Sequence, residues 1–209
     1  MGFEFRDQQL ELLRGMKRYN VWICHRRFGK TIAALKALHL SAIDPKMTKK
    51  RMRLGYVCPY LKQAKQVAWD YLKDFCHGQG VTFNEAELRA DFPNGARITL
   101  YGADNMHSMR GLYFDGIVID EPAQCPRELY GEIVRPALAD RKGWVVFIGT
   151  PKGRGHLYEL FQRALSDERW SARLFRSSET GILSDDELAE MKKEMTEQEI
   201  AQELECSWD

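Results

Sequence analysis

Four short apolar runs divide the sequence into segments of alternating character. Each run is uncharged, four or five residues long, and typical of a strand buried on both faces of a sheet: 21–24, 54–58, 116–119 and 144–148. Around them, apolar residues recur at helical spacing within otherwise polar stretches: 7–18, 31–43, 61–76, 126–139 and 156–165. This alternation predicts an α/β fold with a mostly parallel central sheet flanked by helices.

A small antiparallel addition is predicted between the second and third runs. Residues 81–83 and 97–101 read as short strands, and Phe92-Pro93-Asn94-Gly95 between them is typical of a hairpin turn.

The C-terminal part of the chain has weaker patterns. Residues 172–175 are a candidate last edge strand, and Ser184 and Thr196 are helix-start residues followed by acidic side chains. We therefore expect a core over 1–180 and a helical extension over 181–209.

Composition narrows the class of protein. The 209 residues are 44% hydrophobic and 29% charged with a net charge of +1, as in an ordinary globular domain without an overall basic field. One segment, 46–53, is strongly basic and is either a contact to a phosphate backbone or a solvated loop. The longest apolar run is too short to cross a bilayer, and charges stand where a signal peptide would be apolar. Five scattered cysteines without a Cys-x-x-Cys pair argue against a disulfide framework or a zinc knuckle and favour a reducing cytoplasm.

The first candidate site joins the first apolar run to the helix that follows it. Gly29-Lys30-Thr31 fits the end of the phosphate-binding loop G-x-x-x-x-G-K-[ST], with Cys24 in place of the first Gly. Backbone N–H groups at the helix N-terminus can cradle phosphate oxygens there. Lys30 can reach the outer phosphates, and the Thr31 hydroxyl can take one position on Mg²⁺.

The third apolar run ends in Asp120-Glu121. A central parallel strand delivers such carboxylates to the carboxyl edge of its sheet. Asp120 can hold the Mg²⁺ shell, and Glu121 can polarise an attacking water as a general base. Together with Gly-Lys-Thr upstream, these acids predict a P-loop ATPase with a catalytic glutamate.

Two further positions leave alternatives open. Thr150, at the tip of the fourth run, is either a sensor of the γ-phosphate or an ordinary exit from a strand. Gln8 and Gln9 either read the adenine edge, since an amide can donate and accept at once, or lie at a solvated helix terminus.

Taken in order, these motifs resemble the ATPase domain of the large terminase subunit, the DNA-packaging motor of tailed bacteriophages. Three segments are similar to that family's phosphate loop, second motif and coupling motif: Arg-Arg-Phe-Gly-Lys-Thr, Ile-Val-Ile-Asp-Glu and Gly-Thr-Pro. The likeness runs from Gln9 through Thr150, and 200–209 resembles the segment that leads to the family's nuclease domain. It implies an ASCE-type P-loop NTPase fold, with no nuclease activity expected from these residues.

The resemblance also implies roles for single residues. Gln9, or alternatively Gln8, would contact adenine, and Arg26 would face the γ-phosphate. Phe28, Gly29, Lys30 and Thr31 would bind the nucleotide. Arg27 would either join them or hold the loop to its surroundings. Arg110 would be a finger that reaches a neighbouring subunit.

The implied function is an ATP-hydrolysing motor that drives double-stranded DNA into a procapsid, with Thr150 coupling hydrolysis to movement. ATP and Mg²⁺ are the implied cofactors; the partners would be DNA, the portal protein and the small terminase subunit, with no membrane. Copies would form a ring, a pentamer, in the host bacterial cytoplasm, with a monomer in isolation. The alternatives are a helicase-like P-loop nucleic-acid ATPase and a nucleotide-binding assembly switch without efficient turnover.

Overall fold

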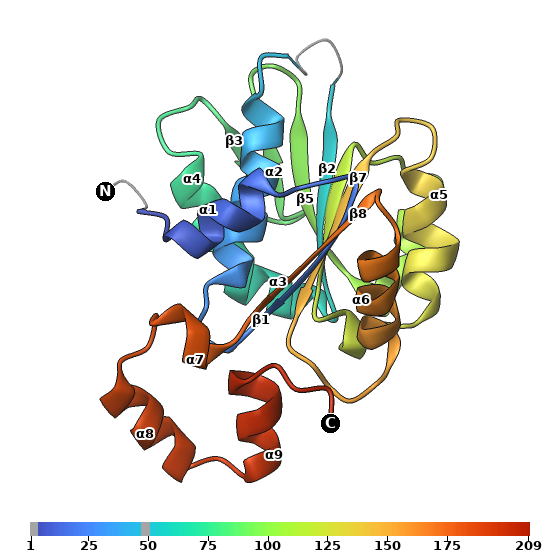
Figure 1. Ribbon diagram of the computed structural model, residues 1–209. Coiled ribbons are helices and arrows are strands. Elements are labelled where there is room, and N and C mark those ends of the chain that lie inside the picture. Colours follow the sequence, from blue (N-terminus) through green and yellow to red (C-terminus); the bar gives the residue numbers. More distant parts are fainter. Residues whose placement is uncertain (1–3, 47–50) are drawn as a thin grey trace.

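An eight-stranded sheet forms the centre of the computed structural model, which describes residues 4–46 and 51–209 (Figure 1). The strand order is β3-β4-β5-β2-β6-β7-β1-β8. Six strands run parallel: β1 (Tyr19–Cys24), β2 (Arg53–Cys58), β5 (Arg97–Gly102), β6 (Gly116–Asp120), β7 (Trp144–Gly149) and β8 (Trp170–Phe175). Two short antiparallel strands extend one edge: β3 (Thr82–Asn84) and β4 (Arg89–Asp91). The predicted fold class is confirmed.

Helices cover both faces of the sheet (Figure 1). On one face lie α1 (Asp7–Arg14), α2 (Lys30–Ile43) and a continuous helix made of α3 (Leu61–Ala64), the π-helical turn η1 (Lys65–Trp69) and α4 (Asp70–Phe75). On the other lie η2 (Ala103–Met109), η4 (Leu129–Val134), α5 (Arg135–Ala137) and α6 (His156–Ser166). Because both faces are covered, the central strands are apolar without alternation. None of the described helices is long and apolar enough to span a membrane.

The C-terminal residues form short helices beside the sheet: α7 (Ser177–Thr180), α8 (Asp185–Lys193), α9 (Glu197–Glu199) and η5 (Ile200–Leu204). Both predicted helix starts are confirmed, because Ser184 accepts the Glu187 N–H and Thr196 forms a capping box with Glu199. The Trp208 ring packs on Tyr158 of α6, with ring centroids 5.3 Å apart, which ties the end of the chain to the core. The division at residue 180 stays a prediction.

The predicted hairpin is wrong in its partner strand. The turn at 92–95 exists, with the Gly95 N–H donating to Phe92 O at 2.9 Å, but it joins β5 to β4. β4 is the middle strand of a three-stranded meander, and β3 pairs with it. Its sequence, Arg-Ala-Asp, buries only Ala90, so no apolar run announces it. The edge strand expected at 172–175 is β8, which begins at Trp170.

Gly116 allows the close approach of β6 to the Trp144 ring. A Cβ at this position would overlap the ring atoms of Trp144. We expect Gly116→Ala to lower the free energy of unfolding by about 1 to 3 kcal/mol, because overpacking displaces the ring or the strand. Urea unfolding measures the change.

The matched control is Gly131→Ala in η4, where an added Cβ meets nothing within 4 Å. It should leave stability unchanged or slightly higher. Equal unfolding free energies for the two variants would contradict the steric role of Gly116.

Candidate active site at the carboxyl edge of the sheet

Three adjacent strands end together where the Gly-Lys-Thr segment leaves the sheet. β7 lies between β1 and β6, so the loop after β1, the acids after β6 and Thr150 after β7 meet at one edge. A Cβ on Gly149 would lie 3.5 Å from Glu121 Oε2, which shows how closely the tip of β7 approaches the acid. Thr150 itself is buried. The predicted phosphate, metal and sensor residues are therefore brought together.

The loop between β1 and α2 is held by left-handed residues and by one buried ring. Arg27 has φ 69° and Gly29 has φ 87°. The Phe28 side chain is fully buried and stacks on Phe175 of β8, with ring centroids 5.1 Å apart. Phe28, predicted as a nucleotide contact, thus anchors the loop with its side chain, and its N–H donates to His25 O at 3.3 Å.

Gln9 braces the loop from α1. Its Nε2 donates to Gly29 O at 3.1 Å, and its Oε1 accepts the Arg6 N–H at 3.1 Å. Arg6, which sequence reasoning missed, adds a bond from its guanidinium to Phe28 O at 3.0 Å. The Gln9 amide is buried and used at both ends, so contact with adenine requires it to exchange one of these bonds. Gln8 donates instead to Thr180 O of α7 at 3.1 Å.

Lys30 and Glu121 form an ion pair across the site, with 3.4 Å between Nζ and Oε1. The exposed fractions of the two side chains are 16% and 15%. Burial alone would lower the pKa of Lys30, but the charges of Glu121 and Asp120 outweigh it, and the pKa is raised. Lys30 therefore stays charged beneath the loop.

Asp120 is fixed by a buried hydroxyl that no sequence motif singles out. The Tyr56 hydroxyl of β2 donates to Asp120 Oδ2 at 2.5 Å. Burial, and then the charge of Asp120, holds the pKa of Tyr56 well above its usual value, so it remains a donor. Asp120 Oδ1 has no partner among the described residues.

The environment of Asp120 favours its neutral form. Burial, and then the neighbouring Glu121 charge, raises its pKa to about 6. A divalent cation would offset both effects. The unpaired Oδ1 and the Thr31 hydroxyl are hard oxygen ligands of the kind Mg²⁺ takes, and Mg²⁺ usually completes its shell with water and phosphate oxygens. The donor set thus fits Mg²⁺.

Glu121 has the unusual backbone of the site, with φ 49° and ψ 56°. A left-handed non-glycine residue is strained, and such residues gather at functional positions. Its N–H donates to Ile148 O of β7, and Pro122 then begins η3 (Pro122–Gln124). Glu121 Oε2 is buried without a partner among the described residues, so one carboxylate oxygen remains available.

The two loop arginines are exposed, and the loop backbone is tied to the C-terminal extension. The Arg26 N–H donates to Glu203 O at 2.8 Å, and the His25 ring shares a 2.9 Å hydrogen bond with Thr180 Oγ1. Neither contact could be foreseen from the sequence, because both partners lie far along the chain. The Arg26 and Arg27 side chains face solvent rather than the buried acids.

Arg110 lies outside this cluster. Its side chain is 56% exposed, and its guanidinium donates to His107 Nδ1 and to Glu132 Oε2, each at 3.1 Å. No contact joins it to the loop or to Asp120 within the described part of the chain. Within a single chain it is therefore not part of the site.

The fold and site define a P-loop NTPase with a glutamate after its second motif. Residues 25–209 match the family "Terminase large subunit, T4likevirus-type, N-terminal", and the chain belongs to that family. The predicted family is confirmed.

Similar proteins agree with this assignment. The large terminase subunits of Thermus phage G20c and Thermus virus P23-45 are each 39% identical over 59 residues, which is 28% of this chain and 12% of each relative. The ATPase domain of the Thermus phage P74-26 large terminase has a TM-score of 0.85 at 18% identity, over 99% of this chain and 95% of that one. The ADP complex of the large terminase of another thermophilic bacteriophage has a TM-score of 0.82 at 16% identity, over 98% of this chain and 54% of that one. The chain thus spans about half of that large terminase.

The raised pKa of Asp120 gives a measurable dependence of stability on pH. The native carboxyl keeps its proton up to about pH 6, whereas the unfolded one loses it near its ordinary pKa of 3.8. Between these values the native state binds more protons, so rising pH lowers the free energy of unfolding by up to roughly 1.4 kcal/mol per pH unit. Asp120→Asn keeps an acceptor for the Tyr56 hydroxyl but has no carboxyl group at this position. Its free energy of unfolding therefore does not fall with rising pH for this reason.

We therefore expect the stability advantage of Asp120→Asn over the unaltered chain to grow from about pH 4 to about pH 7 in Mg²⁺-free buffer, as measured by urea unfolding. Asp140→Asn, at an exposed turn, is the control and should follow the unaltered chain. A constant difference between Asp120→Asn and the unaltered chain would show that the native carboxyl ionises normally.

Proposed function

We propose that this chain is the ATP-hydrolysing motor domain of a DNA-packaging terminase, which drives double-stranded DNA into a procapsid. One observation carries the proposal: Lys30, Asp120 and Glu121 converge at the N-terminus of α2, with one oxygen of each carboxylate unpaired among the described residues. A buried ion pair with two unpaired oxygens is costly unless a ligand completes it. Mg²⁺ with a nucleoside triphosphate supplies the missing partners.

The nucleotide would lie along the loop. Backbone N–H groups at the start of α2 bind phosphate oxygens, and Lys30 turns from Glu121 to the outer phosphates. Thr31 and Asp120 Oδ1 would hold Mg²⁺, which would supply positive charge to the bound phosphates. Tyr56 positions Asp120 for this task, since it occupies only Oδ2.

Glu121 would activate the attacking water. Lys30 contacts Oε1, and the unpaired Oε2 is the atom that can accept a hydrogen bond from water. Thr150, buried after the strand between loop and acid, would sense the phosphate and couple hydrolysis to movement. By the family resemblance, Arg26 would contact the γ-phosphate, with Arg27 as a further nucleotide contact or a support for the loop. Gln9, or alternatively Gln8, would contact adenine after exchanging a hydrogen bond that it makes here.

The comparisons support the choice of nucleotide. Structures of the large terminase of a thermophilic bacteriophage exist with ADP and with ATP-gamma-S. By family, the proposed partners are duplex DNA, a portal protein and a small terminase subunit, and the proposed assembly is a ring of copies, a pentamer, in the host cytoplasm. An exposed Arg110 outside its own site fits an arginine that acts on a neighbouring copy.

Two substitutions test the site. Lys30→Ala should abolish ATP binding and turnover, because the phosphates lose their cation. Glu121→Gln should retain binding but lower turnover by roughly 10² to 10⁴-fold, the usual worth of general-base catalysis. Nucleotide binding and phosphate release are measured at high protein concentration, with Glu168→Gln, an exposed carboxylate, as the control. Normal turnover in either site variant would refute the assignment.

Mixed chains test Arg110. Arg110→Ala alone should lower turnover by about 10³-fold or more if the guanidinium acts as an arginine finger. Mixing Arg110→Ala with Glu121→Gln should restore part of the activity, because one interface then combines an intact arginine with an intact glutamate. Arg127→Ala, an exposed arginine paired with Glu159, should need no rescue. Absence of rescue at every mixing ratio would count against action in trans.

A further inference from the structure

A polar cleft lies along β2, β4 and β5, away from the loop after β1 that carries the candidate nucleotide site. It has a volume of about 320 Å³ and follows β5 from Arg97 at the start of the strand to Tyr101 near its end. Three arginines, two tyrosines and a carboxylate are among the residues that line it: Arg53, Arg89, Arg97, Tyr101, Tyr113 and Glu87. Nothing in the proposed hydrolysis uses these residues.

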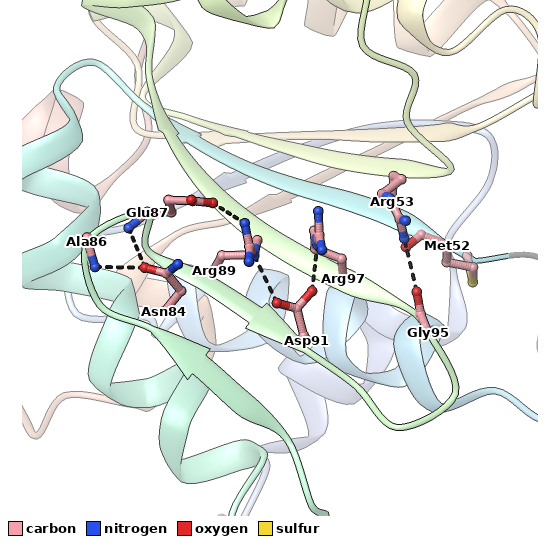
Figure 2. Close-up of polar contacts among 9 residues, drawn as sticks. All are labelled: Met52, Arg53, Asn84, Ala86, Glu87, Arg89, Asp91, Gly95 and Arg97. Atoms are coloured by element: carbon pink, nitrogen blue, oxygen red, sulfur yellow. Dashed lines mark hydrogen bonds and ion pairs between the residues drawn. The ribbon is translucent and has the colours of Figure 1, made fainter.

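Strand register places the arginines on one face of the sheet. Arg53 of β2 lies directly opposite Arg97 of β5, and Arg97 lies opposite Asp91 of β4. The alternate residues Ile98 and Ala90 are buried in the other face. Figure 2 shows the Arg89 and Arg97 side chains on either side of Asp91, with Arg53 farther along the same edge. The arginines thus occupy three adjacent strands.

The cluster keeps an excess of positive charge. Asp91 accepts from Arg89 at 2.9 Å and from Arg97 at 2.6 Å, and Glu87 pairs with Arg89. The Arg53 guanidinium donates only to main-chain carbonyls, those of Arg51, Met52 and Gly95, within the described residues. Three cations therefore face two carboxylates, and like charges directly opposite each other in a sheet are destabilising.

The basic segment of the sequence ends at this cleft, because its last residue, Arg53, is part of the lining. Lys46 and Arg51 are exposed, and Arg53 begins β2; residues 47–50 of the segment lie outside the described residues. Adjacent strands are about 4.8 Å apart, so three strands spread the arginines over roughly 10 Å, the rise of about three base pairs along one DNA strand. Guanidinium groups are suited to bidentate phosphate contacts.

We propose that this cleft binds the phosphodiester backbone of duplex DNA, at a site separate from the nucleotide; the choice of DNA rests on the proposed function. Asp91 holds the Arg89 and Arg97 guanidiniums in position, and Arg53 supplies the unpaired charge. Tyr101 and Tyr113 line the same cleft and would contact the sugars, with the Arg141 guanidinium 3.9 Å from the centroid of the Tyr113 ring. Contacts of this kind are independent of base sequence, as a packaging motor requires.

The test is the salt dependence of binding to a short fluorescent duplex, followed by anisotropy. Each phosphate contact contributes about 0.9 to the slope of log K against log salt concentration. Arg53→Gln and Arg97→Gln should each reduce the slope by about 1, and the double variant by about 2, equally for duplexes of different sequence. Arg169→Gln is the control: that arginine is exposed, paired with Asp167, and adjoins β8 at the other edge of the sheet.

Arg53→Gln removes no carboxylate partner and so separates DNA binding from folding, which thermal unfolding verifies. The ATP turnover of Arg53→Gln without DNA should equal that of the unaltered chain. A loss of DNA binding can therefore be distinguished from damage to the nucleotide site. Slopes matching the control, undetectable duplex binding by the unaltered chain at about 50 mM salt, or equal competition by polyglutamate would each overturn the proposal.

Discussion

The ion pair between Lys30 and Glu121 is the interaction on which the site depends. Each charge is largely removed from water, and each makes the other tolerable, because an isolated buried charge would neutralise itself or reorganise its surroundings. The pair spans β7, which separates the loop strand from the strand of the acids. Its geometry is thus set by the order of three strands rather than by either motif alone. In this arrangement Lys30 holds the Glu121 carboxylate in place; in the proposed reaction, phosphate would compete for its ammonium group.

Around that pair the chain braces its loop from two directions. Gln9 and Arg6 hold the backbone carbonyls of Gly29 and Phe28 from the N-terminal side. Phe175 and Glu203 accept the N–H groups of His25 and Arg26 from the C-terminal side. The loop is therefore a junction between the first helix, the edge strand and the extension, and a change in loop conformation on phosphate binding would be felt by all three. This is a physical basis for coupling nucleotide state to the shape of the domain.

The sequence predicted the parts of this site that follow from local pattern. An apolar run before Gly29-Lys30-Thr31, and another before Asp120-Glu121, were enough to place the loop and the acids at the ends of parallel strands. The sequence could not reveal that β7 separates them, since strand order depends on contacts between distant residues. The role of Tyr56 was not predicted, because in the sequence it is one of several apolar residues in a buried strand. β4 was missed because it buries a single alanine, and the engagement of the Gln9 amide depends on a loop far along the chain from it.

The two-sided bracing also sets the order in which the domain can form during synthesis. β1 emerges early, yet both strands that flank it, β7 and β8, come from the last third of the chain. Contacts of such sequence separation are slow to close. Until residues 170–206 have left the ribosome, the loop has neither its stacking partner Phe175 nor the carbonyl of Glu203. The loop therefore precedes the C-terminal segments that brace it by more than a hundred residues, and its native conformation depends on contacts of long sequence separation.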